Sequence, residues 1–252
     1  MIRAGLIGGK LGHSYSVRIH QMIWQELGLE GEYNLLETPA EGLPELLEKI
    51  RQDYVGVNVT IPHKIAVLGM CDRVTEVAQA IGAVNTLTFG EGRIGGDNTD
   101  YFGFGRMLEH FGLSLANRSA AVLGDGGASR CVCAYLDNHK VQYSVLSRKQ
   151  GFDWSRAAGA DLLINATPVG MFPNTGESMV EEKQLAQFQD VLDLIYNPGE
   201  TLLLQRAKKQ GCRVCNGQYM LVAQAVGAEA VWLGRKMPEG LIQRVYDRMR
   251  WK

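Results

Sequence analysis

The chain has 252 residues, of which 46% are hydrophobic and 21% are charged, as in a globular protein of one large or two ordinary domains. Its formal net charge of −1 leaves no excess of cations for a phosphate backbone, which argues against a nucleic-acid partner. No apolar run approaches the roughly 18 residues of a membrane span, and residues 1–14 lack the apolar segment of a signal peptide, so we expect a cytoplasmic protein without a membrane partner.

Strand-like and helix-like segments alternate through the first hundred residues. The expected strands are residues 2–8, 32–38 and 55–60, and the expected helices between them are residues 17–28 and 43–52. This βαβαβ order predicts a parallel sheet. Residues 83–100 break the order with alternating polarity around glycine-rich turns, which predicts a β-hairpin.

A second α/β unit follows a predicted helix at residues 101–112. The expected strands are residues 119–124, 141–147, 160–167 and 190–196, and the expected helices are residues 130–139, 215–234 and 239–251. The sequence thus predicts an α/β fold of two units joined near Asp100. A cleft between two such units is a usual place for a ligand.

The five cysteines do not form a metal-binding pattern. Their odd number fits a reducing compartment better than a disulfide framework. Cys131 and Cys133 fall on a predicted helix, where two positions rotate by about 200°. Cys212 and Cys215 lie three residues apart on a predicted strand, on opposite faces. We therefore expect buried thiols and no metal site.

A glycine-rich turn opens the second unit at "AVLGDGGASR". An apolar strand leads into Gly124, Gly126, Gly127 and Ala128, and helix amides after such a turn can receive a pyrophosphate. The GxGxxG fingerprint is met only approximately, and a strand-to-helix turn without a ligand is the alternative. Because the Asp125 carboxylate would repel a pyrophosphate, we expect it to face outward.

The end of the next predicted strand favours NADP over NAD. NAD sites usually carry an acidic residue there for the ribose hydroxyls. Here Ser147, Arg148 and Lys149 supply two cations and no carboxylate, which suits a 2′-phosphate. A solvated basic turn is the alternative reading.

Polar residues recur at predicted strand ends and turns. The segments are "HSYS", "NVTIPHK", "GAVNT", "DNTDYFG", "NATPVGM", "DLIYNP" and "NGQYMLVAQ". Each alone could be capping or turn chemistry. In this order and spacing they resemble the shikimate dehydrogenase family, NADP-dependent enzymes that reduce 3-dehydroshikimate, along essentially the whole chain.

The resemblance implies a domain plan. Residues 1–100 with 217–252 would form a substrate-binding and catalytic domain, and residues 101–216 a Rossmann-like NADP-binding domain. The C-terminal helices would return to the first domain. The partner would be the small-molecule substrate, and the protein a monomer or homodimer.

The resemblance also implies roles for individual residues, with Lys64 and Asp100 as the catalytic pair. Ser14 and Ser16 would bind the substrate carboxylate, with Tyr196 nearby. The residues that would hold the substrate ring and hydroxyls are Asn58, Thr60, Asn85, Asp100 and Gln224. The residues that would bind the cofactor are Gly124, Gly126, Gly127, Ala128, Ser147, Arg148, Lys149, Thr167 and, near the nicotinamide, Gly217. Asn85 and Gly217 could instead serve turns.

Several positions depart from the family pattern. Lys10 replaces a usual proline, and Val17 and Gln21 replace a usual proline and asparagine beside "HSYS". Asp125 replaces a small residue in the glycine turn, and Ser147 and Lys149 also depart from the usual basic motif. These changes bear on substrate affinity and cofactor preference more than on the type of reaction.

The combination predicts hydride transfer between NADPH and a ketone, with Lys64 delivering the proton. We expect Thr60 to cap a helix that begins at Pro62. The positive N-terminal end of that helix would disfavour the Lys64 ammonium by about 0.3–1 kcal/mol. A carboxylate near 4 Å, here Asp100, is worth about 4 kcal/mol at an effective dielectric near 20, so Lys64 should stay charged.

Two alternatives remain open. A relative on the same scaffold could act on quinate or an aminated shikimate analogue. A protein of another class, a non-catalytic sensor, could bind NADP or a small acid without turnover. The presence of both Lys64 and Asp100 argues against the sensor, because binding alone needs no proton donor.

Overall fold

A computed structural model describes residues 1–12 and 14–251, which divide into two compact units. The first unit contains Met1–Gly103 and Val222–Met249, and the second contains Phe104–Leu221 and the described C-terminal residues 250–251. The chain passes between them within two helices, α4 (Thr99–His110) and α8 (Gln218–Leu233). The sequence analysis expected these two domain boundaries to lie after residues 100 and 216. Within the described residues, no helix is long and apolar enough to cross a membrane.

The first unit is built on a mixed six-stranded sheet. Its strands are β1 (Ile2–Gly8), β2 (Gly31–Glu37), β3 (Gly56–Val59), β4 (Arg73–Val74), β5 (Thr86–Gly90) and β6 (Arg93–Asp97), in the order β2-β1-β3-β5-β6-β4. Strand β1 pairs in parallel with β2 and β3, as the βαβαβ pattern predicted. The predicted hairpin is also confirmed: β5 and β6 are antiparallel, and their turn is Glu91 (φ 51°) and Gly92 (φ 71°).

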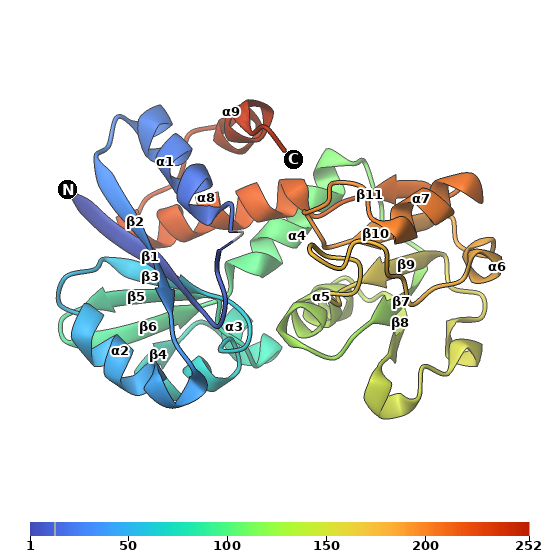
Figure 1. The fold of residues 1–252 in the computed structure, drawn as a ribbon, viewed down its shortest axis with the longest axis horizontal. Helices are drawn as coiled ribbons and strands as arrows, with labels where there is room; N and C mark the ends of the chain where they lie inside the picture. The colour runs from blue at the N-terminus through green and yellow to red at the C-terminus, as the bar shows by residue number, and fades with distance from the viewer. Residues whose placement is uncertain (13, 252) are drawn as a thin grey trace. The chain divides into compact units, whose positions relative to one another are not determined.

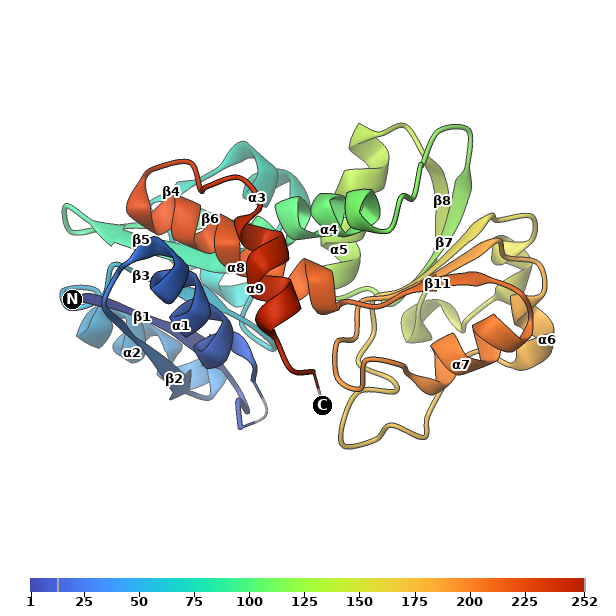
Figure 2. The same cartoon turned by 90° about the horizontal axis from the view of Figure 1, so that it is seen from above.

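Helices cover both faces of this sheet (Figures 1 and 2). They are α1 (Ser16–Leu27), α2 (Leu43–Ile50), α3 (Glu76–Ile81), α8 and α9 (Leu241–Arg248). Leu43 and Leu47 of α2 pack with Val57 on one face. On the other face, Trp24 of α1 and Trp232 of α8 belong to one apolar cluster. The Trp232 indole Nε1 donates to the backbone oxygen of Leu87, 2.9 Å away, which ties α8 to β5.

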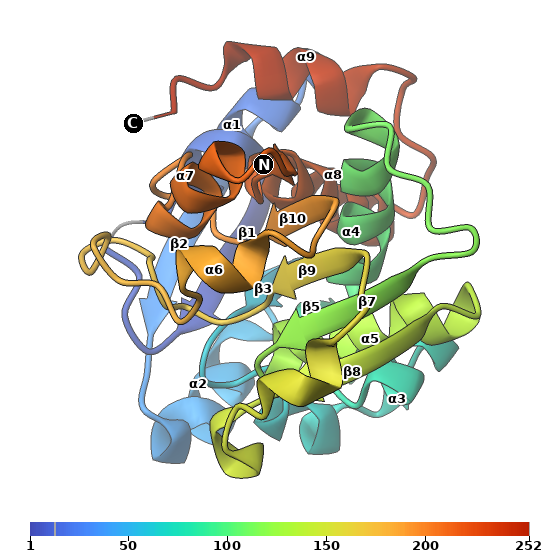
Figure 3. The same ribbon diagram turned by 90° about the vertical axis from the view of Figure 1, so that its right-hand side faces the viewer.

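The second unit is a doubly wound parallel sheet (Figure 3). Its strands are β7 (Ser119–Leu123), β8 (Gln142–Leu146), β9 (Leu162–Asn165), β10 (Asp190–Asp193) and β11 (Arg213–Cys215), in the order β11-β10-β9-β7-β8. Helix α5 (Gly127–Asn138) packs on one face, and α6 (Glu182–Leu185) and α7 (Leu202–Lys209) pack on the other. The strand order reverses between β9 and β7, where sheets of this kind bind ligands at the carboxyl ends of their strands.

Two local predictions were wrong. No helix begins at Pro62: residues 61–65 form turns, and a 3₁₀ helix follows at Ala66–Met70. The backbone oxygen of Thr60 accepts from the His63 amide at 2.9 Å, so a turn forms where a capped helix was expected. Cys212 lies just before β11 rather than on it, although it is buried as expected.

Candidate active site

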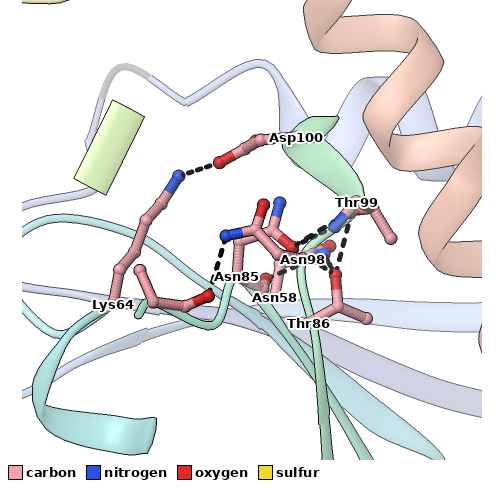
Figure 4. Close-up of polar contacts among 8 residues, drawn as sticks. Asn58, Lys64, Asn85, Thr86, Asn98, Thr99 and Asp100 are labelled. Carbon is pink, nitrogen blue, oxygen red and sulfur yellow. Dashed lines mark hydrogen bonds and ion pairs between the residues drawn. The ribbon is translucent and has the colours of Figure 1, made fainter. Parts of the chain in front are cut away.

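Lys64 and Asp100 form a close ion pair in the first unit (Figure 4). Lys64 Nζ lies 2.6 Å from Asp100 Oδ2, and their side chains are 18% and 10% exposed. The backbone oxygen of Lys64 accepts from the Val84 amide at 2.8 Å, which fixes the turn that carries the lysine. Asp100 lies in the first turn of α4, where the helix N-terminus favours a carboxylate. The pair therefore presents a partly exposed ammonium whose position is set by a nearly buried anion.

Asn85 positions the start of the helix that carries Asp100. Its Oδ1 accepts from the Thr99 amide at 2.7 Å and from the Thr86 hydroxyl at 2.9 Å. The Thr86 and Thr99 hydroxyls are 3.0 Å apart, and both threonines are buried. Asn85 thus links β5 to the first residue of α4. The sequence analysis missed Thr86 and Thr99, although Thr99 lies inside the "DNTD" segment that it singled out.

Asn58 joins the same network from the centre of the sheet. It lies on β3 and is 5% exposed. Its Nδ2 donates to the Thr86 hydroxyl at 3.2 Å and to the Asn85 backbone oxygen at 3.4 Å. Its Oδ1 accepts from the Tyr33 hydroxyl at 2.8 Å. The side-chain amide is therefore held at both ends, and Tyr33 is a further residue that the sequence analysis missed.

The two serines of "HSYS" lie at the start of α1. The Ser14 hydroxyl accepts from the Ser16 amide at 3.1 Å, and Ser16 is the first residue of the helix. His13 of this segment lies outside the described residues. Val17, one of the departures from the family pattern, packs on the cluster around Trp24.

Two more predicted substrate residues belong to the first unit and are half-buried. Thr60 directly follows β3, and Gln224 lies on α8. Tyr196 belongs instead to the second unit, where it follows β10.

In the glycine turn of the second unit, the backbone lies close to the neighbouring segment that follows β9. Gly124 has φ +105°, and a Cβ there would lie 2.9 Å from Thr167 Cγ2. Gly126 precedes the first residue of α5, and a Cβ there would meet nothing within 4 Å, so the space beside the start of the helix is open. Gly124 and Thr167 follow β7 and β9, the two strands at which the order reverses. A phosphate group fits this position.

The residues after β8 can complete a dinucleotide site. Ser147 is 2% exposed, yet its hydroxyl has no hydrogen-bond partner within the described residues. Arg148 and Lys149 are exposed. The Asp125 carboxylate lies 3.4 Å from Lys149 Nζ and is 44% exposed. An unpaired buried hydroxyl beside two cations suits a cofactor that brings acceptor oxygens and negative charge.

Gly217 has a structural reason to be glycine. A Cβ there would lie 2.0 Å from the backbone oxygen of Leu194, closer than any real contact. Its amide also donates to the Ile195 oxygen at 3.0 Å. The packing of this turn therefore requires glycine whether or not a nicotinamide approaches it.

Comparisons with known proteins give a consistent result. Residues 6–87 match the family model of the shikimate dehydrogenase substrate binding domain. The chain is 38% identical to the shikimate dehydrogenase (NADP(+)) of Clostridium perfringens (strain SM101 / Type A), over 98% of this chain and 97% of the relative.

Solved structures agree with this match. A chorismate mutase/shikimate 5-dehydrogenase fusion protein from Clostridium acetobutylicum is 40% identical, with a TM-score of 0.91 over 98% of this chain and 96% of that chain. The shikimate 5-dehydrogenase of Thermus thermophilus, in complex with NADP(H) and shikimate, is 35% identical, with a TM-score of 0.89 over 98% of this chain and 99% of that chain.

Proposed function

Because the chain belongs to the shikimate dehydrogenase family, we propose that it catalyses the reversible NADPH-dependent reduction of 3-dehydroshikimate to shikimate. The observation that carries this proposal is the ion pair of Lys64 and Asp100, 2.6 Å apart and bordered by Asn85. We also propose that the protein works in the cytoplasm, as a monomer or homodimer.

Lys64 acts on the oxygen of the reacting carbonyl. Negative charge develops on this oxygen during reduction, and a nearby ammonium stabilises that charge and donates the proton that completes the hydroxyl group. The hydride for the carbonyl carbon comes from bound NADPH. Asp100 holds Nζ in place from the first turn of α4, and in the reverse reaction neutral Lys64 takes the proton back.

The remaining residues of the first unit bind and orient the substrate. Ser14 and Ser16 at the start of α1 bind the carboxylate, since hydroxyl and amide donors suit an anion without adding charge. Asn58, Thr60, Asn85 and Gln224 orient the hydroxyls and the ring. The internal hydrogen bonds of Asn58 and Asn85 support this role, because they fix both amides before a ligand arrives.

The second unit holds NADP through the glycine turn and the residues after β8. The amides at the start of α5 receive the pyrophosphate, and Gly124 and Thr167 border it. The Arg148 guanidinium and the unpaired Ser147 hydroxyl bind the 2′-phosphate, with Lys149 adjacent. Tyr196 and Gly217 contribute near the substrate carboxylate and the nicotinamide.

One assay tests this proposal against its alternatives. Purified protein is mixed with shikimate or quinate and with NADP⁺ or NAD⁺, and formation of the reduced cofactor is followed by absorbance. We expect the highest kcat/KM for shikimate with NADP⁺. A preference for quinate would reassign the substrate, and binding of NADP⁺ without turnover of either acid would indicate a sensor.

A further inference from the structure

Tyr33 contacts the proposed substrate site but is not itself one of the proposed substrate-binding residues. It lies on β2 and is 5% exposed. Its hydroxyl lies 2.8 Å from Asn58 Oδ1. One buried hydroxyl therefore contacts a residue proposed to bind the ring hydroxyls of the substrate.

The direction of the Tyr33–Asn58 hydrogen bond is fixed by its neighbours. The Asn85 backbone oxygen can only accept, so the Asn58 side chain must turn Nδ2 toward it. Oδ1 of Asn58 then faces Tyr33, whose hydroxyl must donate. Burial and the charge of Glu229 raise the pKa of Tyr33 well above its ordinary value, so the hydroxyl keeps the proton that this bond needs.

The ring of Tyr33 is held as firmly as its hydroxyl. It stacks on the His20 ring with 4.2 Å between centroids and 14° between planes. His20 Nδ1 lies 2.6 Å from Glu229 Oε1, and both side chains are fully buried. Glu229 lies on α8, so helices α1 and α8 together set the position of Tyr33 on β2. The hydroxyl therefore reaches Asn58 from a buried, stacked ring.

We propose that Tyr33 is a positioning residue that orients the Asn58 amide for the substrate. This inference rests on the proposed function, because Asn58 must contact the substrate. Without the hydroxyl, the Asn58 amide would be held only through Nδ2, and its oxygen would be buried without the donor that fixes it. The loss should appear in substrate binding and not in the proton transfer carried out by Lys64.

The test is Tyr33→Phe, which removes one oxygen and keeps the stacked ring. We expect the KM for shikimate to rise about fivefold to tenfold, the effect of one hydrogen bond, with kcat changed less than about twofold. The dissociation constant of NADPH should not change. Tyr54→Phe is the matched control, since the Tyr54 hydroxyl donates to Asn34 Oδ1 at 2.7 Å in the same unit but contacts no proposed site residue.

The Asn58→Ala variant, made with and without Tyr33→Phe, shows whether Tyr33 affects KM through Asn58. If Tyr33 acts through Asn58, Tyr33→Phe should raise KM by less than about twofold in the Asn58→Ala background. An equal rise in both backgrounds, an unchanged KM in Tyr33→Phe, or the same loss in Tyr54→Phe would overturn the inference. Calorimetric titration with shikimate separates the two proposals: wild-type protein that neither binds nor oxidises shikimate defeats the proposed function itself.

Discussion

The proposed substrate residues and the proposed cofactor residues differ in whether their polar groups already have hydrogen-bond or ion-pair partners within the protein. In the first unit, Asn58, Asn85 and Asp100 are buried and each is bonded to protein groups. In the second unit, the Arg148 guanidinium is exposed and has no ion pair or hydrogen bond among the described residues, and the buried Ser147 hydroxyl has no partner there. The proposed substrate site is therefore preorganised, whereas the proposed cofactor site would be completed by the cofactor itself.

This difference has a measurable consequence. Residues that share hydrogen bonds act as a unit, so their substitutions should show strong coupling. Exposed residues that meet only the ligand should contribute almost independently. Coupling energies therefore distinguish the two sites.

The largest expected effect is at Lys64. Lys64→Ala should lower kcat about 10²–10⁴-fold, the range for loss of a general acid or base, with only a modest change in KM. Asp100→Asn keeps the shape but removes the charge and should also lower kcat. The double variant should be little worse than the worse single one.

The values of kcat and KM are measured by steady-state kinetics on variants that are shown to be folded and to bind NADPH. Lys183→Ala is the control, because Lys183 forms an exposed ion pair with Glu181 at 2.8 Å. It should leave kcat unchanged. Additive losses for Lys64 and Asp100 would mean that they act independently, and near-normal turnover in Lys64→Ala would remove the lysine from the mechanism.

The second prediction concerns Asp193, a buried group that is connected through Asn165 to Thr167, one of the proposed cofactor residues. Asp193 is fully buried and accepts hydrogen bonds from the Thr201 hydroxyl at 2.6 Å and from Asn165 Nδ2 at 3.0 Å. Asn165 Oδ1 in turn holds the Thr167 hydroxyl at 2.7 Å. Desolvation raises the pKa of Asp193 from 3.8 to about 6, although the hydrogen bonds oppose the rise.

The sign of its effect on stability follows from linkage. Between pH 3.8 and about 6 the folded protein holds a proton that the unfolded chain has released, so the contribution of Asp193 to stability falls as pH rises. The total change is on the order of 3 kcal/mol, at about 1.4 kcal/mol per pKa unit. Urea unfolding of wild-type protein and Asp193→Asn across this range should show the difference. A difference between the two that is independent of pH would refute the shift.

The sequence indicated the residues proposed to carry the chemistry, but it did not indicate the residues that hold them in place. Strand and helix periodicity gave the two units, and the polar segments brought together Lys64, Asp100 and Asn85. Local pattern could not reveal Tyr33, because its partner Asn58 lies on another strand and the contact exists only once β2 and β3 flank β1. The same limit explains the error at Pro62: helix-start signals are local, but the turn at Lys64 is held by the amide of the distant Val84.

The Arg148→Ala variant tests the proposed cofactor site of the second unit. If its guanidinium binds a 2′-phosphate, Arg148→Ala should weaken NADPH about tenfold to hundredfold, as expected for a charge-assisted contact, and NADH far less. Fluorescence titration of both cofactors measures this selectivity. Equal losses for NADPH and NADH would disprove the assignment. Ser14→Ala or Ser16→Ala should raise KM for shikimate without changing NADPH affinity. Combined with Arg148→Ala, each substitution should therefore keep the effect that it has alone.

The smallest expected effect, and the most specific to this chain, is at Asp125. Its carboxylate lies 3.4 Å from Lys149 Nζ, and the lysine is 84% exposed. An exposed pair of this kind is weak, so Asp125 reduces the positive charge near Arg148 more than it stabilises the fold. It also adds a negative charge to the turn proposed to receive the pyrophosphate.

Asp125→Ala should therefore tighten NADPH about twofold to fivefold, with a smaller gain for NADH. Asp125→Asn, which keeps the shape, should give most of the same gain. Because exposed charges are screened over about 10 Å at 0.1 M salt, the gain should shrink as salt is raised. Titrations of the three proteins at low and high salt measure it. Weaker NADPH binding in both variants would show the opposite role, with Asp125 holding Lys149 in place for the phosphate.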